Sequence, residues 1–327
     1  MNEIRARVII QERGFCKIAS EYGEKWAEVS GKFRHEAGAA ADFPAVGDYC
    51  LALWPEDDSK AIITMLFPRR SCFSRKAAGK DRQEQVVAAN IDYAFLCMAL
   101  NNDFNLRRLE RYLAIAWDSG ATPIVLLTKK DLCEDIEEKL HRVERVAAGV
   151  DTLMISSFDA SYTEVENLLE EGKTYAFLGS SGVGKSTLIN RMMGEEILAT
   201  NGLRNDDKGR HTTTHRQLIS LQNGAFVIDT PGMRELGVWD NQEGISATFS
   251  DIEELERQCK FGNCSHTSEP GCAILAALAG GILDEKRWES YQKLSVENAY
   301  AADGDSYLRE KNEKFKKIAK MNRTNKR

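Results

Sequence analysis

Short apolar segments alternate with turn-forming residues along the first seventy positions of the chain. Glycine, proline and charged residues interrupt the segments at 12–14, 22–24, 44–48 and 55–58. Short apolar segments between such clusters are typical of β-strands. The strands that this pattern predicts lie at residues 8–10, 16–19, 26–29, 49–54 and 61–65. Five short strands in this length match a small OB-like β-barrel, which we predict for residues 1–70.

Two roles fit such a barrel. Barrels of this size often bind single-stranded or structured nucleic acid, but a barrel that only packs on its neighbour fits the pattern equally well. A polar segment with several basic residues, Arg69 to Arg82, follows Pro68. We interpret residues 71–82 as a linker, with a surface that faces RNA as the alternative.

Beyond this segment the pattern changes to longer apolar runs that alternate with segments of helical spacing. The apolar runs predict buried strands at 91–100, 123–127, 152–155, 175–178 and 225–228. The helical spacing predicts helices at 105–119, 135–148 and 162–171. The alternation predicts an α/β domain over residues 83–237.

The strand at 175–178 runs into a glycine-rich loop and then into a helix. Gly-x-x-x-x-Gly-Lys-Ser occupies 179–186, and in this context backbone amides and the helix dipole bind a phosphate chain. Lys185 is expected to reach the β- and γ-phosphates, and Ser186 to bind Mg²⁺. A glycine-rich turn with a chance lysine is the weaker alternative. The candidate nucleotide-binding residues here are Gly179, Ser180, Ser181, Gly182, Val183, Gly184, Lys185, Ser186 and Thr187.

A second motif predicts that the base of the nucleotide is guanine. The strand at 123–127 ends in Thr128-Lys129-Lys130-Asp131, which fits the Asn/Thr-Lys-x-Asp element of GTPases. The Asp131 carboxylate would accept hydrogen bonds from guanine N1–H and the exocyclic amine, a donor pattern that adenine lacks. Asn is more usual than Thr128 at the first position. After the strand at 152–155, two serines stand where GTPases contact guanine O6, although a strand-to-helix turn looks similar: Ser156 and Ser157.

Two further segments predict switches that sense the γ-phosphate. A polar segment ends in His211 and three threonines, and a Thr there can bind Mg²⁺ only when a γ-phosphate is present. In Asp-Thr-Pro-Gly at 229–232, Asp229 is expected to hold the Mg²⁺ hydration shell and Gly232 N–H to contact the γ-phosphate. The next residue, Met233, cannot orient the attacking water as a Gln would. His211 is the best substitute, with a solvent-facing or RNA-facing His as the alternative.

The order of these motifs is unusual. In a conventional GTPase the guanine-reading element follows Asp-x-x-Gly, but here the only match lies upstream, at 128–131. The nucleotide domain is therefore predicted to be circularly permuted. In this order the switch at 229–237 continues directly into the C-terminal region, so a change of nucleotide can be transmitted to that region through the chain.

Composition and charge limit the location and the partners. Apolar residues make up 43% of the chain, and the net charge of −6 gives no overall attraction for nucleic acid. The start lacks a signal core and no apolar stretch could span a membrane, which predicts a cytosolic protein. The last nineteen residues, 309–327, carry a net charge of +7. This tail is expected to contact RNA, with a solubilising helix as the alternative.

Three cysteines and one histidine cluster within fourteen residues near the C-terminal end. They are spaced Cys-x4-Cys-x-His-x5-Cys at Cys259, Cys264, His266 and Cys272. Three thiolates and one imidazole suit a closed, tetrahedral and hence structural Zn²⁺ site, and a cytosolic context argues against disulfides. Helices are expected at 252–258, 273–278 and 285–294. We predict a small helical zinc-binding domain over 238–327, suited to binding rather than catalysis.

With these pieces together, the chain resembles the RsgA/YjeQ family of circularly permuted GTPases, which depend on the small ribosomal subunit. The resemblance covers nearly the whole length. It rests on the segments 68–71, 88–92, 104–113, 128–132, 179–190, 209–214, 229–232 and 259–272.

The resemblance implies an OB-fold, a permuted GTPase domain and a zinc domain. It implies a GTPase that checks or assists late maturation of the small ribosomal subunit, with its outer domains touching ribosomal RNA and protein. It also implies that His211 takes part in ribosome-stimulated hydrolysis, and that Thr213 is the switch threonine.

We therefore predict a monomeric enzyme that hydrolyses Mg-GTP to GDP and phosphate when the small subunit completes its site. Lys185 stabilises the transferring charge, Asp131 selects guanine and His211 orients water, while Mg²⁺ is organised by Ser186, Thr213 and Asp229. A permuted GTPase of large-subunit assembly would also fit the motif order, but it predicts neither barrel nor zinc cluster. An RNA-binding switch with negligible turnover and an ATPase are two further hypotheses for the same motifs.

Overall fold

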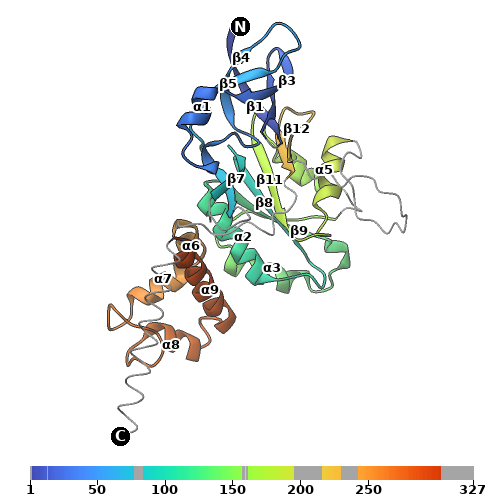
Figure 1. Ribbon diagram of the computed structural model, residues 1–327. Helices are drawn as coiled ribbons and strands as arrows, with labels where there is room; N and C mark the ends of the chain where they lie inside the picture. The colour runs from blue at the N-terminus through green and yellow to red at the C-terminus, as the bar shows by residue number, and fades with distance from the viewer. Residues whose placement is uncertain are drawn as a thin grey trace, which may run out of the picture. The chain divides into compact units, whose positions relative to one another are not determined.

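The chain divides into two compact units, Met1–Gly237 and Val238–Arg327. The computed structural model describes residues 2–12, 14–76, 84–156, 159, 161–194, 216–229 and 242–302. Figure 1 shows the elements of both units. Among the described residues, no helix combines the length and the apolar composition needed to cross a membrane.

A closed barrel of five strands begins the first unit. The strands are β1 Asn2–Gln11, β2 Cys16–Ser20, β3 Gly23–Val29, β4 Tyr49–Trp54 and β5 Ala61–Leu66. The sheet closes because β1 pairs with both β2 and β4, while β5 pairs with both β3 and β4. Small side chains such as Ala6, Ala27 and Ala52 lie fully or almost fully buried inside it, together with Val8 and Ile18. The predicted barrel is thus confirmed.

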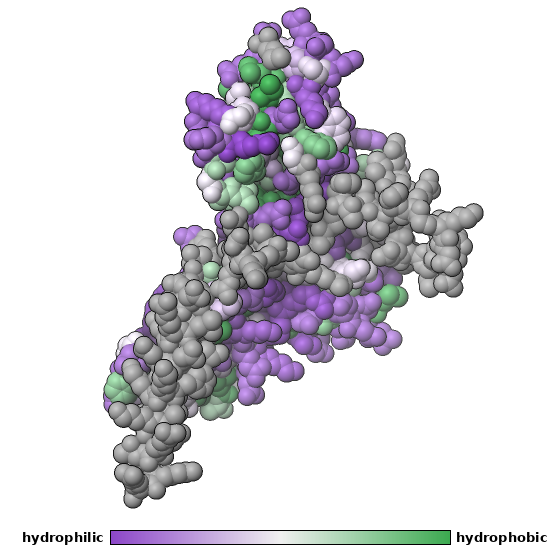
Figure 2. Space-filling model, in the orientation of Figure 1, coloured by the Kyte–Doolittle hydropathy of each residue, from purple (hydrophilic) through white to green (hydrophobic). Residues whose placement is uncertain are grey.

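The barrel also contains elements that the sequence pattern did not predict. Helix α1 (Gly31–Glu36) and the 3₁₀ turn η1 (Ala40–Asp42) fill the connection between β3 and β4. The Ser30 hydroxyl accepts a hydrogen bond from the Phe33 N–H (3.0 Å) and so begins the helix. In the view of Figure 2, some apolar side chains show among the hydrophilic ones over the barrel. The large hydrophobic residues that are exposed in the described part of the barrel are Phe15, Tyr22, Trp26 and Met65.

The segment interpreted as a linker, 71–82, is structured in its first half. Cys72–Lys76 form strand β6, which pairs antiparallel with β7 (Glu84–Ala89). The Phe73 side chain is only 1% exposed, so this strand is anchored by burial as well as by its backbone hydrogen bonds. The linker prediction is wrong here because it rests on the basic residues alone. The aromatic side chain of Phe73, which lies between them in the sequence, is buried and holds the segment in place.

The α/β part of the first unit is a mostly parallel sheet in the order β10-β9-β8-β11-β13-β12. The strands are β8 Tyr93–Ala99, β9 Thr122–Thr128, β10 Thr152–Met154, β11 Thr174–Gly179, β12 Gln217–Ser220 and β13 Phe226–Asp229. All neighbours are parallel except β12, which is antiparallel to β13. The accompanying elements are α2 Leu106–Ser119, η2 Lys130–Leu132, α3 Ile136–Val146, α4 Tyr162–Asn167 and α5 Lys185–Met193.

Barrel and α/β sheet are continuous through one strand pair. Strand β1 pairs with β12 at Ile10 and Gln217, which makes a single sheet of eleven strands. Beside this junction Arg7, 7% exposed, donates to the Thr174 hydroxyl (2.6 Å) and stacks on the Phe226 ring. Thr174 and Phe226 begin β11 and β13, so the barrel contacts the two strands that lead to the phosphate loop and to Asp229.

The second unit is helical. Its described elements are α6 Glu243–Thr248, α7 Ser250–Arg257, α8 Ala273–Ala279 and α9 Glu285–Ala302. Buried Ile245, Phe249 and Trp288 contribute to its interior. Arg287, 7% exposed, forms two hydrogen bonds to the Asp251 carboxylate, which joins α9 to α7.

Candidate functional site

The glycine-rich loop leaves the sheet at the end of its most buried strand. All six residues of β11 are buried. A Cβ atom on Gly179, the last of them, would lie 2.8 Å from the Cys97 carbonyl oxygen, so only glycine fits. Gly184 has a φ of 108°, a left-handed conformation that glycine adopts without strain, and α5 begins at the next residue. The predicted strand, loop and helix therefore follow one another directly.

Lys185 is held against this loop by backbone oxygens. Its Nζ donates hydrogen bonds to the carbonyls of Gly179 and Ser180, both at 2.7 Å. The ammonium is thus placed at the loop itself, where a phosphate chain would bind in a loop of this type. Ser186 is half-buried and Thr187 is exposed in the first turn of α5.

Thr128 connects the predicted guanine-reading element to the glycine-rich loop. It is the last residue of β9 and is 6% exposed. Its hydroxyl donates to the carbonyl of Val183 at 2.7 Å. Thr128, which replaces the more usual Asn, therefore still offers a side-chain hydrogen-bond donor. This donor binds the glycine-rich loop.

The chain brings Asp131 and Ser156 together although 25 residues separate them. Strands β9 and β10 are parallel neighbours, so the segments that follow them meet at one edge of the sheet. The Ser156 hydroxyl donates to the Asp131 carboxylate at 2.5 Å. Asp131 is exposed and Ser156 is buried. The buried hydroxyl therefore orients the Asp131 carboxylate from the protein side, and the carboxylate stays accessible to a base. Lys129 has a φ of 59°, a left-handed conformation, at the start of η2.

One residue in contact with the phosphate loop was missed by the sequence analysis. Asp103, in the loop between β8 and α2, accepts a hydrogen bond from the Ser180 hydroxyl (2.5 Å) and another from Arg108 (2.7 Å). The Asn-Asp segment around it predicts a turn, but no local pattern indicates that the turn lies beside the glycine loop.

The switch segments fall mostly outside the part of the chain that the structure describes. The backbone of Asp229 ends β13, beside β11. Four predicted site residues lie outside the described residues: Ser157, His211, Thr213 and Gly232. Their roles stay predictions.

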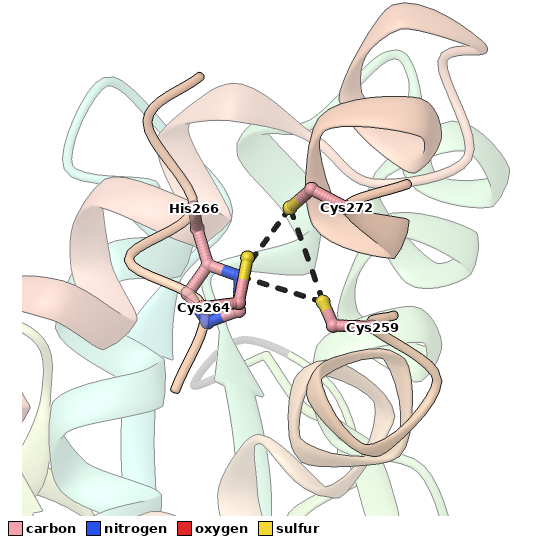
Figure 3. A group of neighbouring side chains, drawn as sticks. All are labelled: Cys259, Cys264, His266 and Cys272. Carbon is pink, nitrogen blue, oxygen red and sulfur yellow. Dashed lines mark hydrogen bonds between the residues drawn. The ribbon is translucent and has the colours of Figure 1, made fainter. Parts of the chain in front are cut away.

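The cysteine and histidine residues of the second unit converge on one point. The ligand atoms of Cys259, Cys264, His266 and Cys272 all lie within 4.8 Å of one another (Figure 3). Cys259 follows α7, Cys272 is the residue before α8, and the other two come from the loop between these helices. His266 has a φ of 56°, and this left-handed turn accompanies the approach of its ring to the sulfurs.

The distances within this cluster fit a tetrahedral metal ion. The Sγ atoms of Cys259 and Cys272 are 3.9 Å apart, and Nδ1 of His266 lies 3.6 Å and 3.4 Å from them. A metal about 2.3 Å from each sulfur would separate two sulfurs by about 3.8 Å. The ligand atoms of Cys259, His266 and Cys272 therefore already lie near the separations that a tetrahedral metal ion requires.

The local environment affects the protonation of these thiols. Burial raises the pKa of Cys259, but hydrogen bonds from backbone N–H groups at the start of α8 and from the neighbouring thiols together outweigh burial, so the pKa lies below its ordinary value. Burial and the neighbouring thiols raise the pKa of Cys264 to about 11. Two adjacent thiolates repel each other without a cation, so a bound metal would favour the deprotonated form of both.

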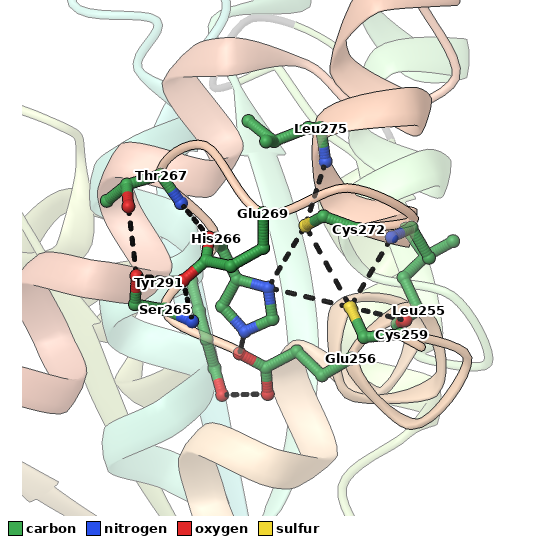
Figure 4. A network of polar contacts seen from close by, with 11 residues as sticks. Leu255, Glu256, Cys259, Ser265, His266, Thr267, Glu269, Cys272, Leu275 and Tyr291 are labelled. Carbon is green, nitrogen blue, oxygen red and sulfur yellow. Dashed lines mark hydrogen bonds and ion pairs between the residues drawn. The ribbon is translucent and has the colours of Figure 1, made fainter. Parts of the chain in front are cut away.

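A second layer of residues orients His266. Its Nε2 lies 3.4 Å from Oε1 of Glu256, and the other carboxylate oxygen of Glu256 accepts a hydrogen bond from the Tyr291 hydroxyl at 3.0 Å (Figure 4). The Trp288 ring meets the imidazole edge-on at 5.5 Å. Carboxylates in this position usually fix the tautomer and the ring orientation of a metal-binding histidine.

Comparison with known proteins identifies the family. A family model described as RsgA GTPase matches residues 66–239. The small ribosomal subunit biogenesis GTPase RsgA 2 of Lactiplantibacillus plantarum is 50% identical over 300 residues, which cover 91% of this chain and 84% of that protein. The corresponding RsgA 1 of Listeria innocua is 45% identical over 322 residues, which cover 97% and 91%.

Two solved structures share the fold. YjeQ from Thermotoga maritima aligns with a TM-score of 0.65 and 24% identity, over 90% of this chain and 97% of that one. YloQ, described as a circularly permuted GTPase, aligns with a TM-score of 0.62 and 25% identity, over 89% and 93%. The permuted motif order agrees with this likeness. The chain therefore belongs to the RsgA family of circularly permuted GTPases.

Proposed function

We propose that this GTPase acts in the assembly of the small ribosomal subunit and that the subunit stimulates its turnover. The relatives that match over nine-tenths of the chain are named as small ribosomal subunit biogenesis GTPases. The missing Gln beside Asp229-Thr230-Pro231-Gly232 supports dependence on a partner, because Met233 cannot orient water. A cytosolic location, which the sequence predicts, accords with this partner.

Two hydrogen bonds support the proposed nucleotide site, one from Thr128 and one from Ser156. Thr128 joins β9 to the phosphate loop, and Ser156 orients Asp131 at the same edge of the sheet. A guanine base bound at Asp131 would thus extend its phosphates toward Lys185. This arrangement supports GTP as the substrate and disfavours ATP, because an oriented carboxylate matches the two donors of guanine.

The hydrolytic roles follow from the chemistry of phosphoryl transfer. Lys185 and the loop amides would stabilise negative charge that develops on the γ-phosphate, and His211 would orient the attacking water. Ser186, Thr213 and Asp229 would hold Mg²⁺, which neutralises the charge of the β- and γ-phosphates when it is bound. The Ser157 and Gly232 amides would contact the base and the γ-phosphate.

We assign zinc to the Cys/His cluster. Three thiolates and an imidazole with no position left open suit Zn²⁺ in a structural role. The second unit would then serve binding rather than chemistry, and the basic tail at 309–327 would add contacts to ribosomal RNA.

GTP turnover by the purified protein tests this function. It should be measured alone, with isolated small subunits and with isolated large subunits, and ATP should be tested as a competitor. We expect slow turnover alone and strong stimulation by small subunits only. Stimulation by large subunits would support a role in large-subunit assembly, and tight GTP binding with no stimulated turnover would support an RNA-binding switch.

A further inference from the structure

Asp103 lies beside the phosphate loop but belongs to none of its motifs. In the sheet, Gly179 of β11 is paired with Cys97 of β8. The loop that follows β8 therefore runs next to the loop that follows β11. Asp103 is the third residue of this β8–α2 loop, counted from Asn101, and is separated from Ser180 by 77 positions in the chain.

The carboxylate of Asp103 is hydrogen-bonded both to the glycine-rich loop and to helix α2. One oxygen, Oδ2, accepts hydrogen bonds from the Ser180 hydroxyl at 2.5 Å and from Arg108 at 2.7 Å. The Asp103 N–H donates to the Asn101 side chain at 3.0 Å, and Asn105 caps α2 by accepting from the Arg108 N–H at 3.1 Å. The carboxylate thus projects from a loop that is itself braced at both ends.

The Asp103 carboxylate is ionised, so both of its oxygens can only accept hydrogen bonds. Burial would raise its pKa, but the hydrogen bonds from Arg108 and Ser180 outweigh burial and hold the pKa below its ordinary value. The group is therefore ionised at neutral pH. Arg108 compensates the negative charge, which would otherwise repel a phosphate chain nearby.

Ser180 links Asp103 to Lys185, because it contacts both residues. Its side chain is held by Asp103, while its carbonyl oxygen accepts a hydrogen bond from Lys185 Nζ. Ser180 is 8% exposed, so its hydroxyl has little access to solvent. A displacement of Ser180 would therefore move one of the two carbonyls that orient the ammonium.

We propose that Asp103 is a positioning residue for GTP hydrolysis: through Ser180 it fixes the carbonyl that aims Lys185 at the transferring phosphate. The proposal rests on the nucleotide site proposed above. Small displacements of a charge-stabilising group reduce turnover strongly, because stabilisation of the transition state depends on its exact placement. Nucleotide binding depends on many amides of the loop as well, so it should change less.

A double-mutant cycle tests the proposal. Asp103→Ala and Ser180→Ala should each lower kcat for GTP about tenfold in single-turnover measurements. The Kd for GDP, measured with a fluorescent analogue, should change less than about threefold, since the ground state depends less on Lys185. The double variant should be no slower than either single variant, because both remove the same bond.

Matched controls separate positioning from stability. Asn102→Ala changes the exposed neighbour in the same loop and should leave kcat unchanged. Asp103→Asn keeps an acceptor oxygen for Ser180 and should recover most of the activity. Wild-type kcat in Asp103→Ala, additive losses in the double variant, or a loss of kcat matched by equal weakening of GDP binding would overturn the proposal.

The outcome is distinguishable from failure of the proposed nucleotide site. If the unaltered protein neither binds GDP nor hydrolyses GTP, the site proposal fails and this inference fails with it. If the unaltered protein turns over GTP and the Asp103 variants match it, only the positioning role is lost.

Discussion

The metal cluster and the nucleotide site draw their residues from the chain in different ways. The four candidate metal-ligand residues come from one stretch of fourteen residues, 259–272, that connects α7 to α8. The nucleotide site combines loops after β8, β9, β10 and β11, which begin between residues 100 and 180. The first site needs only a short loop to close, whereas the second exists only once a parallel sheet has aligned its strand ends.

This difference predicts how each site responds to damage. Removing a ligand from the metal cluster should remove a large part of the free energy that stabilises the second unit, because a unit of this size has only a small hydrophobic core of its own. Removing one contact in the nucleotide site leaves the supporting sheet intact. The losses there should be losses of binding or rate, and not of structure.

The largest effect is expected for Cys264→Ala. Structural zinc contributes on the order of 10 kcal/mol in small domains, so the variant should lose its metal and the helical fold of 242–302. Zinc content by elemental analysis and amide hydrogen exchange of this region measure the result. Cys133→Ala, a thiol outside the cluster, is the control. A folded, metal-free unaltered protein would contradict the zinc assignment.

A smaller but selective effect is expected for Asp131→Asn. Two hydrogen bonds from guanine to a carboxylate contribute about 1.5–3 kcal/mol each, so GTP affinity should fall at least about a hundredfold. The new amide would donate to the 2-oxo group of xanthine, so xanthosine triphosphate should bind better than GTP. Titration with both nucleotides checks this exchange, and Asp135→Asn, four residues away, serves as control. Unchanged preference for GTP would remove Asp131 from base recognition.

For Glu256→Gln we expect weaker metal binding without loss of the fold. The variant keeps the size of the side chain but loses the charge that faces Nε2 of His266. Carboxylates in this position typically contribute a factor of about 10 to 100 in metal affinity. Competition with a zinc-binding dye measures the change. Glu254→Gln, an exposed neighbour on α7, should behave like the unaltered protein, and equal affinities in both variants would argue against a role for Glu256.

The smallest effect is expected for Thr128→Val. The substitution leaves the Val183 carbonyl without its 2.7 Å donor, which costs about 1 kcal/mol and should weaken GTP binding about fivefold. Thr128→Asn offers an amide donor in place of the hydroxyl and should retain affinity. If valine binds GTP as well as threonine does, the contact contributes nothing to the site.

Several features of the molecule could be predicted from local patterns, and the exceptions share a cause. Four barrel strands lie within three residues of their predicted bounds, because their turns carry glycine, proline and charged residues. The first strand is the exception, since the pattern predicts only 8–10 of β1, which runs over Asn2–Gln11. Strand β12 and the hairpin of β6 and β7 were missed. Each has only four to six residues and no clear alternation, so its stability comes from tertiary contacts, through strand pairing and burial, and not from its local pattern.

From residue patterns alone we could predict the family, the α/β class with its N-terminal barrel, the permuted order and the clustering of candidate metal ligands. These depend on residue types at short, fixed spacings, where local geometry leaves few choices. Three side-chain contacts became visible only in the folded chain: Thr128 with Val183, Ser156 with Asp131 and Asp103 with Ser180. Those partners lie 25 to 77 positions apart. Which strand ends become neighbours depends on the order of strands in the sheet, which no local pattern encodes.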